Sequence, residues 1–349
     1  MQKRTLLKSV AAAALLGGAP LVSGAAAPAN AVEVGLYKGA DREAVLLAGA
    51  KKEGELSIYY AHPIVQVVAD AFAKKYGIKI KTWRGGSEAI MQRTMAEFRA
   101  GKADVDVFLS TTADSEAAYR EKMLLEVRSP VQADLIPAAV PDHHQWVAFN
   151  MDIYTAAYNT RLVKKEDLPR RYEDLLDPKW KGKLAVEAND QMWFGSLMDA
   201  MGEDKGLMLF NQIVATNGIS VRKGHSLLAG MVASGEVPLA LTVYSWNPAQ
   251  LKRKGAPIEA LFLPPLFSLA SSVAVLAKAP HPHAAVLFHD FMFTEGQKIL
   301  IDADYIPTSK KQKSGVDLTK VKAISPIDIL RNQDKWLKLY EDTIVKRAR

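Results

Sequence analysis

The stretch GEVPLALTVYSWNPAQ, residues Gly235–Gln250, decides how the chain is interpreted. Residues 237–243 are short, apolar and rich in β-branched side chains, with a proline near the start, so we predict a buried strand. The strand stops at Tyr244, where polar groups and two aromatic rings precede Pro248. In an open α/β sheet, ligands bind beyond the carboxyl ends of the strands. Tyr244 and Trp246 are therefore candidate ligand contacts, and the alternative is an aromatic pair that closes a core edge.

The first 31 residues have the pattern of a secretory signal peptide. Lys3, Arg4 and Lys8 form a basic region, and the apolar segment 10–22 is too short to span a bilayer. A small-x-small cleavage signal at residues 29–31 predicts that the mature chain begins at Val32. The chain has no cysteine, which excludes a lipid-anchored lipoprotein, a disulfide framework and a thiolate metal site. Such an export product is expected in the bacterial periplasm.

Composition limits the classes of partner. The formal net charge is +7, but the basic residues are scattered in pairs that are typical of solvated helix faces, so nucleic-acid binding is not predicted. After the signal, no apolar run approaches the ~20 residues of a membrane-spanning helix. A chain of 349 residues fits about two domains.

The first half of the chain alternates strands with helices, which predicts a parallel, doubly wound α/β sheet. The predicted strands are 56–60, 78–83 and 105–109. Tyr59 should face the core, because side chains alternate along a strand. Gly85-Gly86-Ser87 opens a helix that Ser87 is expected to cap; its backbone N–H groups suit an anion, and a plain tight turn is the alternative. Polar candidates at this sheet edge are Tyr60, His62, Ser87, Ser110 and Thr111.

The second half repeats this arrangement. Residues 146–159 form a long apolar segment that is predicted to pass between domains, and strands are expected at 184–187 and 219–222. Asp190 is placed to cap the helix that follows the first of these strands. The basic tail from Lys335 is expected to be a surface helix. Trp193 is either a wall of the ligand site or a filling side chain. Polar or aromatic candidates here are Asp190, Gln191, Trp193, His225 and Ser226.

Eight segments in order resemble the extracellular solute-binding proteins of ABC importers, in their ferric-ion-binding branch. The segments are GELSIYYAHP, DVDVFLS, TAAYNT, DLLDPKWKGKLAV, ASGEVPLALTVYSW, LKRKGAPIEALF, SSVAVLAKAPHPHAAVLFHDFM and TEGQKIL. The resemblance covers most of the mature chain. It implies the type 2 periplasmic binding protein fold: two doubly wound α/β lobes, a two-segment hinge and an interdomain ligand cleft. Lobe 1 would comprise 32–155 and 272–349, lobe 2 would comprise 156–271, and the hinge would lie near 155–160 and 270–276.

The resemblance also implies a metal set, if the ligand is iron. Ferric members commonly hold iron through two adjacent tyrosines at the strand end that here reads LTVYSW. This chain has Tyr244 followed by Ser245, so the pair is incomplete. His62 stands where some members have a histidine, and Tyr60 offers a second phenol. A further tyrosine of some members is absent from the loop that here reads NDQMW.

The expected function is that of a periplasmic receptor. It would capture a small solute, ferric iron with a synergistic anion, and deliver it to an ABC importer permease in the inner membrane. The alternative solute is a small organic anion such as a phosphonate, sugar phosphate or carboxylate, for which Ser110, Thr111 and Ser226 are suitable donors. A periplasmic enzyme is a third interpretation, but no GxSxG, HExxH or P-loop motif occurs. A monomer without a resident cofactor is expected.

Overall fold

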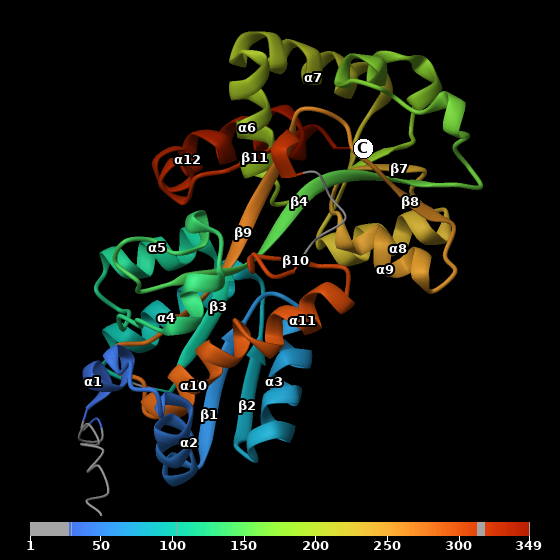
Figure 1. Cartoon of the computed structure of the whole chain (residues 1–349). Coiled ribbons are helices and arrows are strands. Elements are labelled where there is room, and N and C mark those ends of the chain that lie inside the picture. Colours follow the sequence, from blue (N-terminus) through green and yellow to red (C-terminus); the bar gives the residue numbers. More distant parts are fainter. Residues whose placement is uncertain (1–27, 29, 103, 313–317, 349) are drawn as a thin grey trace, which may run out of the picture.

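The computed structural model describes residue 28 and residues 30–348, except 103 and 313–317. The predicted signal peptide, residues 1–31, lies almost entirely outside these described residues. Within the described part of the chain, no helix is long and apolar enough to cross a membrane. Figure 1 shows two bodies joined by long strands, as expected for a two-lobe fold.

The first lobe is built on three parallel strands, β1 (Glu55–Tyr60), β2 (Lys79–Arg84) and β3 (Val107–Thr111). Tyr60 pairs with Arg84 on one side and with Leu109 on the other, so the three strands end at one edge of the sheet, as predicted. The helices of this lobe are α1 (Ala31–Leu36), α2 (Arg42–Glu53), α3 (Ile64–Tyr76), α4 (Ser87–Arg99), α5 (Thr112–Arg120), α10 (Pro282–Met292) and α11 (Glu295–Asp302).

Two strands run through both lobes. β4 (Val147–Asn159) and β9 (Leu266–Val275) pair antiparallel, and they join the first lobe to the second. β9 also pairs antiparallel with β3, so the sheet of the first lobe is mixed, whereas the sequence predicted a parallel sheet. The difference arises because β9 returns to the first lobe and therefore runs against β3. Two short strands, β10 (Ile306–Pro307) and β11 (Val321–Ala323), pair with β4 and β9.

The second lobe repeats the strand–helix arrangement. Its strands are β5 (Leu184–Glu187), β6 (Ser220–Arg222), β7 (Leu239–Tyr244) and β8 (Ile258–Leu261). β5 is parallel to both β6 and β7, and β7 and β8 are antiparallel to β4. The helices are α6 (Gln191–Met201), α7 (Glu203–Asn217), α8 (His225–Ser234) and α9 (Trp246–Arg253).

The final helix, α12 (Pro326–Thr343), is more deeply packed than the sequence suggested. We expected a surface helix from Lys335, but Trp336 and Tyr340 are buried in the core of the second lobe. Their spacing of four residues places both rings on one face of the helix. α12 lies against α6 and also reaches α5 of the first lobe (Figure 1). α12 thus packs on the core of the second lobe, although its residues fall in the range 272–349 that was predicted for lobe 1. The lobe boundaries themselves stay a prediction.

Candidate functional site

The strand β7 ends at Tyr244, and helix α9 begins two residues later. The side chain of Asn247 accepts a hydrogen bond from the backbone N–H of Tyr244 at 3.0 Å, and α9 begins at Trp246. The half-buried ring of Tyr244 is thereby held beside two others. It stacks on His225 with ring centroids 4.1 Å apart, and it lies tilted against Tyr154 at 5.3 Å.

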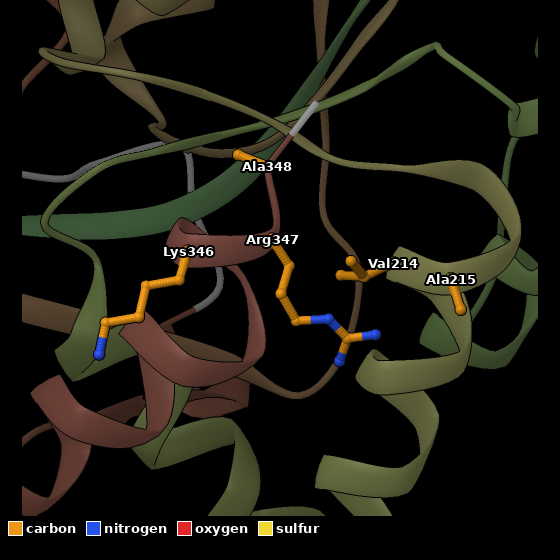
Figure 2. A pocket seen from close by; sticks show the side chains of 5 residues that line it. All are labelled: Val214, Ala215, Lys346, Arg347 and Ala348. Carbon is orange, nitrogen blue, oxygen red and sulfur yellow. The ribbon is translucent and has the colours of Figure 1, made fainter.

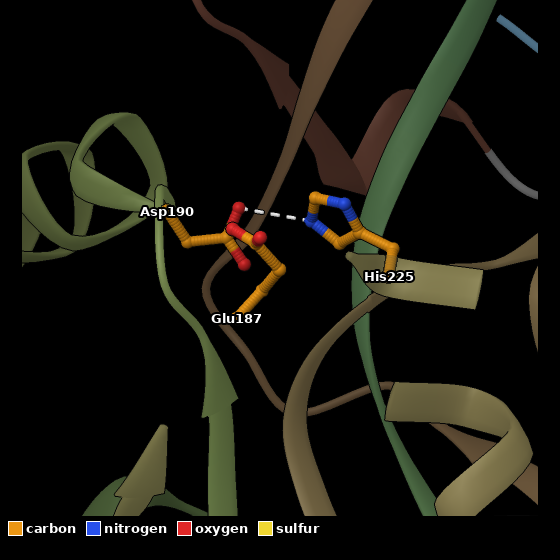
Figure 3. A group of neighbouring side chains, drawn as sticks. All are labelled: Glu187, Asp190 and His225. Carbon is orange, nitrogen blue, oxygen red and sulfur yellow. Dashed lines mark hydrogen bonds and ion pairs between the residues drawn. The ribbon is translucent and has the colours of Figure 1, made fainter. Parts of the chain in front are cut away.

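Three ligating side chains gather next to Tyr244, as Figure 3 shows. Glu187 ends β5, Asp190 immediately precedes α6, and His225 is the first residue of α8. One ligating atom of each lies within 4.8 Å of those of the other two. His225 Nε2 is 3.0 Å from Asp190 Oδ1, and the Glu187 carboxylate accepts the backbone N–H of Gly224 at 2.8 Å. We call Glu187, Asp190 and His225 the acidic triad.

The ionisable groups of the acidic triad shift one another's pKa. Burial and the neighbouring Asp190 raise the pKa of Glu187. Burial alone would lower the pKa of His225, but the Asp190 carboxylate outweighs it and the pKa is raised. Burial and the charge of Asp190 hold the pKa of Tyr244 well above its usual value. Among the described residues, neither acid of the triad forms an ion pair with lysine or arginine.

A second buried acid, Asp152 on β4, lies where the lobes meet. Its carboxylate accepts hydrogen bonds from Trp246 Nε1 at 2.9 Å and from Ser271 Oγ at 3.1 Å, and it lies 3.1 Å from His62 Nε2. Burial acts to raise the pKa of Asp152, but His62 and these donors outweigh it, so the pKa is lowered. Asp152 therefore links the loop after β1, both crossing strands and the start of α9.

Tyr60 and His62 are engaged within the structure. Tyr60 is buried and donates its hydroxyl hydrogen bond to Gln66 at 2.8 Å. His62 is packed against Trp246 and Tyr305, with ring centroids 5.6 and 4.9 Å from its own, and Trp246 in turn stacks on Tyr244. The structure thus does not bring Tyr60 and His62 into ring contact with Tyr244. Tyr59 is in the core as predicted, and its hydroxyl bonds to Glu97.

The hydroxyl candidates of the first lobe serve helix starts. Ser110 and Thr111 both donate to Asp114 Oδ2, at 2.5 and 2.8 Å, and Thr111 caps α5. The prediction that Ser87 caps a helix is wrong, because α4 begins at Ser87 itself and Gly86 is the cap residue. Gly86 has an ordinary extended backbone and makes no side-chain capping bond.

The candidates of the second lobe divide between site and core. Trp193 is buried among Tyr172, Phe194 and Phe210, so it fills the core, which was the alternative for this residue. Asp190 occupies the cap position of α6 but makes no side-chain capping bond, because its carboxylate turns to His225. The prediction that the Asp190 side chain caps this helix is therefore wrong.

Of the three further candidates, Gln191 and Ser226 adjoin residues of the acidic triad in the sequence, and Trp246 does not. Gln191 has a buried side-chain oxygen that has no partner among the described residues. Ser226 accepts a long hydrogen bond, 3.4 Å, from Asn247. Trp246 is packed into the core of the first lobe and bonds to Asp152.

Sequence reasoning missed Glu187, Tyr154 and Asp152. Glu187 was taken only as the last residue of a strand, although it precedes Asp190 by three positions in a strand-end loop. Asp152 carries a visible signal, since it is a carboxylate inside an otherwise apolar segment. Tyr154 carries no such signal, because an aromatic residue is common in a buried strand.

A pocket elsewhere in the structure is separate from the acidic triad. It lies between the end of α7 and the C-terminal turn and is lined by Val214, Ala215, Lys346, Arg347 and Ala348 (Figure 2). Lys346 is paired with Asp342 at 2.8 Å, and Arg347 bonds to Asn211. The cations that line this pocket are therefore already engaged.

The sequence profile of the bacterial extracellular solute-binding proteins matches residues 68–325. The chain belongs to this family. The structure of this solute-binding protein agrees, since the periplasmic binding protein AfuA from Actinobacillus pleuropneumoniae, solved with exogenous fructose-6-phosphate, superposes with a TM-score of 0.73. That match covers 83% of this chain and 98% of AfuA at 24% identity, and it establishes the two-lobe fold alone.

Relatives of this solute-binding protein have names that refer to different solutes. Iron uptake protein A1 of Synechocystis sp. is 28% identical over 257 residues, which are 67% of this chain and 69% of the relative. A putative 2-aminoethylphosphonate-binding periplasmic protein of Salmonella typhimurium is 29% identical over 196 residues, 54% of this chain and 55% of the relative. Capture of a small solute is common to these proteins, and the solute differs among them.

Proposed function

We propose that this solute-binding protein is a periplasmic receptor that captures a metal cation and passes it to the permease of an ABC importer. Ferric iron with a synergistic anion is the foremost cargo. The observation that carries the proposal is the convergence of Glu187, Asp190 and His225 beside Tyr244. Oxygen and imidazole ligands suit iron and other first-row metals. The metal is cargo and not a resident cofactor.

The charge of the site favours a cation over an organic anion. Glu187, Asp190 and Asp152 are three buried acids in this region, and among the described residues their only ion-pair partners are histidines. A phosphonate or sugar phosphate would place further negative charge beside the carboxylates of Glu187 and Asp190, which is unfavourable unless a cation comes with it. Ser110 and Thr111, the expected oxyanion donors, are already engaged by Asp114.

The family and the N-terminal sequence support the proposed location and partner. The basic and apolar segments of residues 1–31 have the form of a cleaved export signal. Proteins of an extracellular solute-binding family act before a membrane step, so we propose the inner-membrane permease as the partner. A catalytic role has no support from the motifs of this sequence.

A thermal-shift titration of the mature protein tests the proposal. Metal is removed by a chelator, and Fe³⁺ as its citrate complex, 2-aminoethylphosphonate and fructose 6-phosphate are then added in separate series. We expect the melting temperature to rise with Fe³⁺, because a ligand that binds only the folded state stabilises it. Citrate alone is the control. A rise with the organic anions and none with metal would refute metal capture, and mass spectrometry of the purified protein would identify the solute.

A further inference from the structure

The acidic triad lies entirely in the second lobe. Glu187 and Asp190 follow one strand, β5, and His225 begins α8, so no residue of the first lobe belongs to the group. Ligand atoms that lie ~2.0–2.2 Å from one metal ion are about 3–4 Å from each other. The 3.0 Å between His225 Nε2 and Asp190 Oδ1 falls in this range. The 4.8 Å limit for the whole group lies slightly above it, so the ligand atoms would draw together around an ion.

One buried oxygen of the triad has no hydrogen-bond partner among the described residues. Asp190 is 1% exposed, and its Oδ2 is a buried acceptor without a hydrogen-bond donor among the described residues. In Figure 3 the Asp190 carboxylate faces His225, with the Glu187 carboxylate beside it. A buried carboxylate oxygen is costly to leave unpaired, so such an atom indicates a missing positive group.

The scaffold fixes the ligands before any solute arrives. The backbone N–H groups of Asn189 and Gly224 donate to the two carboxylate oxygens of Glu187, at 2.5 and 2.8 Å. The backbone of Glu187 is held on both sides, since its N–H donates to Thr242 Oγ1 at 3.0 Å and its carbonyl accepts the hydroxyl of Tyr340. Each carboxylate oxygen has further lone pairs, so these bonds orient Glu187 without using its capacity to bind metal.

We infer that the acidic triad is the primary metal site, and that it binds one first-row transition-metal ion through Glu187, Asp190 and His225. This assignment rests on the proposed function and replaces the set Tyr244, Tyr60 and His62. Tyr244 lies beside the site, with its ring stacked on His225. Because all three ligands belong to one lobe, the ion binds to the open protein, and closure of the first lobe follows.

Isothermal titration of the full mature chain, freed of metal, tests the assignment with Zn²⁺ and with Fe³⁺ as its citrate complex. Wild-type protein is expected to bind one ion per chain. Glu187→Gln, Asp190→Asn and His225→Asn should each weaken binding by more than the ~10–100-fold that is typical for groups behind the ligands. Asp199→Asn is the matched control, because Asp199 is an exposed acid on α6, the helix that Asp190 immediately precedes. It should bind like the wild type, and Tyr244→Phe should lose less than ~10-fold.

The outcomes separate the assignment from the function. If Tyr244→Phe abolishes binding while Glu187→Gln and Asp190→Asn keep it, the protein captures metal but the triad assignment is wrong. If the wild type binds neither ion, metal capture itself fails. Melting curves of the metal-free variants show whether each is folded. If one acid variant unfolds, the other carries the test, because Glu187 ends β5 whereas Asp190 precedes α6.

Discussion

Single acidic residues illustrate how burial decides a role. Asp152 and Asp190 are both almost inaccessible, at 3% and 1% exposure, yet their surroundings differ. Asp152 has donors from Trp246, Ser271 and Asn150 in addition to His62, so its charge is satisfied. Asp190 retains an oxygen that has no partner in the described part of the chain. The first acid is therefore structural, and the second is available to a cation.

We predict that Asp152→Asn destabilises the protein strongly. The amide would present N–H groups to donors of Trp246 and Ser271, and it would leave His62 without its anion. The free energy of unfolding should fall by about 2–4 kcal/mol. Urea denaturation monitored by tryptophan fluorescence measures this loss. Asp142→Asn, at an exposed acid, is the control, and an effect of Asp152→Asn no larger than that of the control would contradict the role assigned to Asp152.

Loss of the ion pair of Arg42 and Asp290 should lower the free energy of unfolding when the pH becomes acidic. Burial acts to raise the pKa of Asp290, but the hydrogen bond from His289 and the charge of Arg42, 2.6 Å away, outweigh it and the pKa is lowered. A carboxylate with a depressed pKa in the folded state stabilises the protein above its unfolded pKa of ~4. This contribution is lost as the pH falls through the folded pKa. The difference in the free energy of unfolding between wild type and Asp290→Asn, measured by urea denaturation, should therefore narrow below about pH 4. A difference that stays constant with pH would contradict the role assigned to this ion pair.

At the scale of elements, α12 closes the second lobe and supports the site. Its Trp336 packs against the α6 backbone at Gly195, and its Tyr340 bonds to the carbonyl of Glu187. The hydroxyl of Tyr340 thus connects the end of the chain to the strand end that carries the acidic triad. A helix that looks like a basic surface tail is an internal support of the site.

Two glycine substitutions should have opposite effects. In Gly195→Ala the new methyl group would overlap the Trp336 indole, so α12 must shift. We expect the free energy of unfolding to fall by about 1–3 kcal/mol. In Gly230→Ala, within α8, no atom lies within 4 Å of the new methyl group. Here alanine should stabilise the helix by roughly 0.5–1 kcal/mol. Thermal unfolding of both variants measures the contrast, and equal effects would show that α6 and α12 are not tightly packed.

For the whole molecule, β4 and β9 are the paired strands that extend through both lobes. Both run from one sheet into the other, and Asp152 and Ser271 bind each other across them at the junction. Contacts beside the junction also tie α9 to the first lobe, through Gln250 and the Ala303 carbonyl at 2.8 Å and through Arg253 and Asp304 at 3.0 Å. These polar contacts are suited to being made and broken as the lobes close.

We predict that metal binding compacts and stabilises the protein. Small-angle X-ray scattering should show a smaller radius of gyration with Fe³⁺ citrate than with citrate alone, because the closed form makes contacts that the open form lacks. At a free metal concentration of ~100 times Kd, the free energy of unfolding should rise by about 2.7 kcal/mol. Asp190→Asn should show neither change. Stabilisation without compaction would mean that the ion binds but the lobes do not close around it.

The sequence by itself determined the class of the fold, the crossing segment predicted at 146–159 and the position of Tyr244 at a strand end. These features depend on local periodicity and on the order of elements, which a single chain displays directly. Only the tertiary structure decided which polar residues meet. Glu187, Asp190 and His225 are separated by up to 38 positions and come together because β5 and α8 are neighbours in space. Trp193 became core and α12 a buried helix for the same reason: burial is a property of the packed elements, and the local pattern records only which face is apolar.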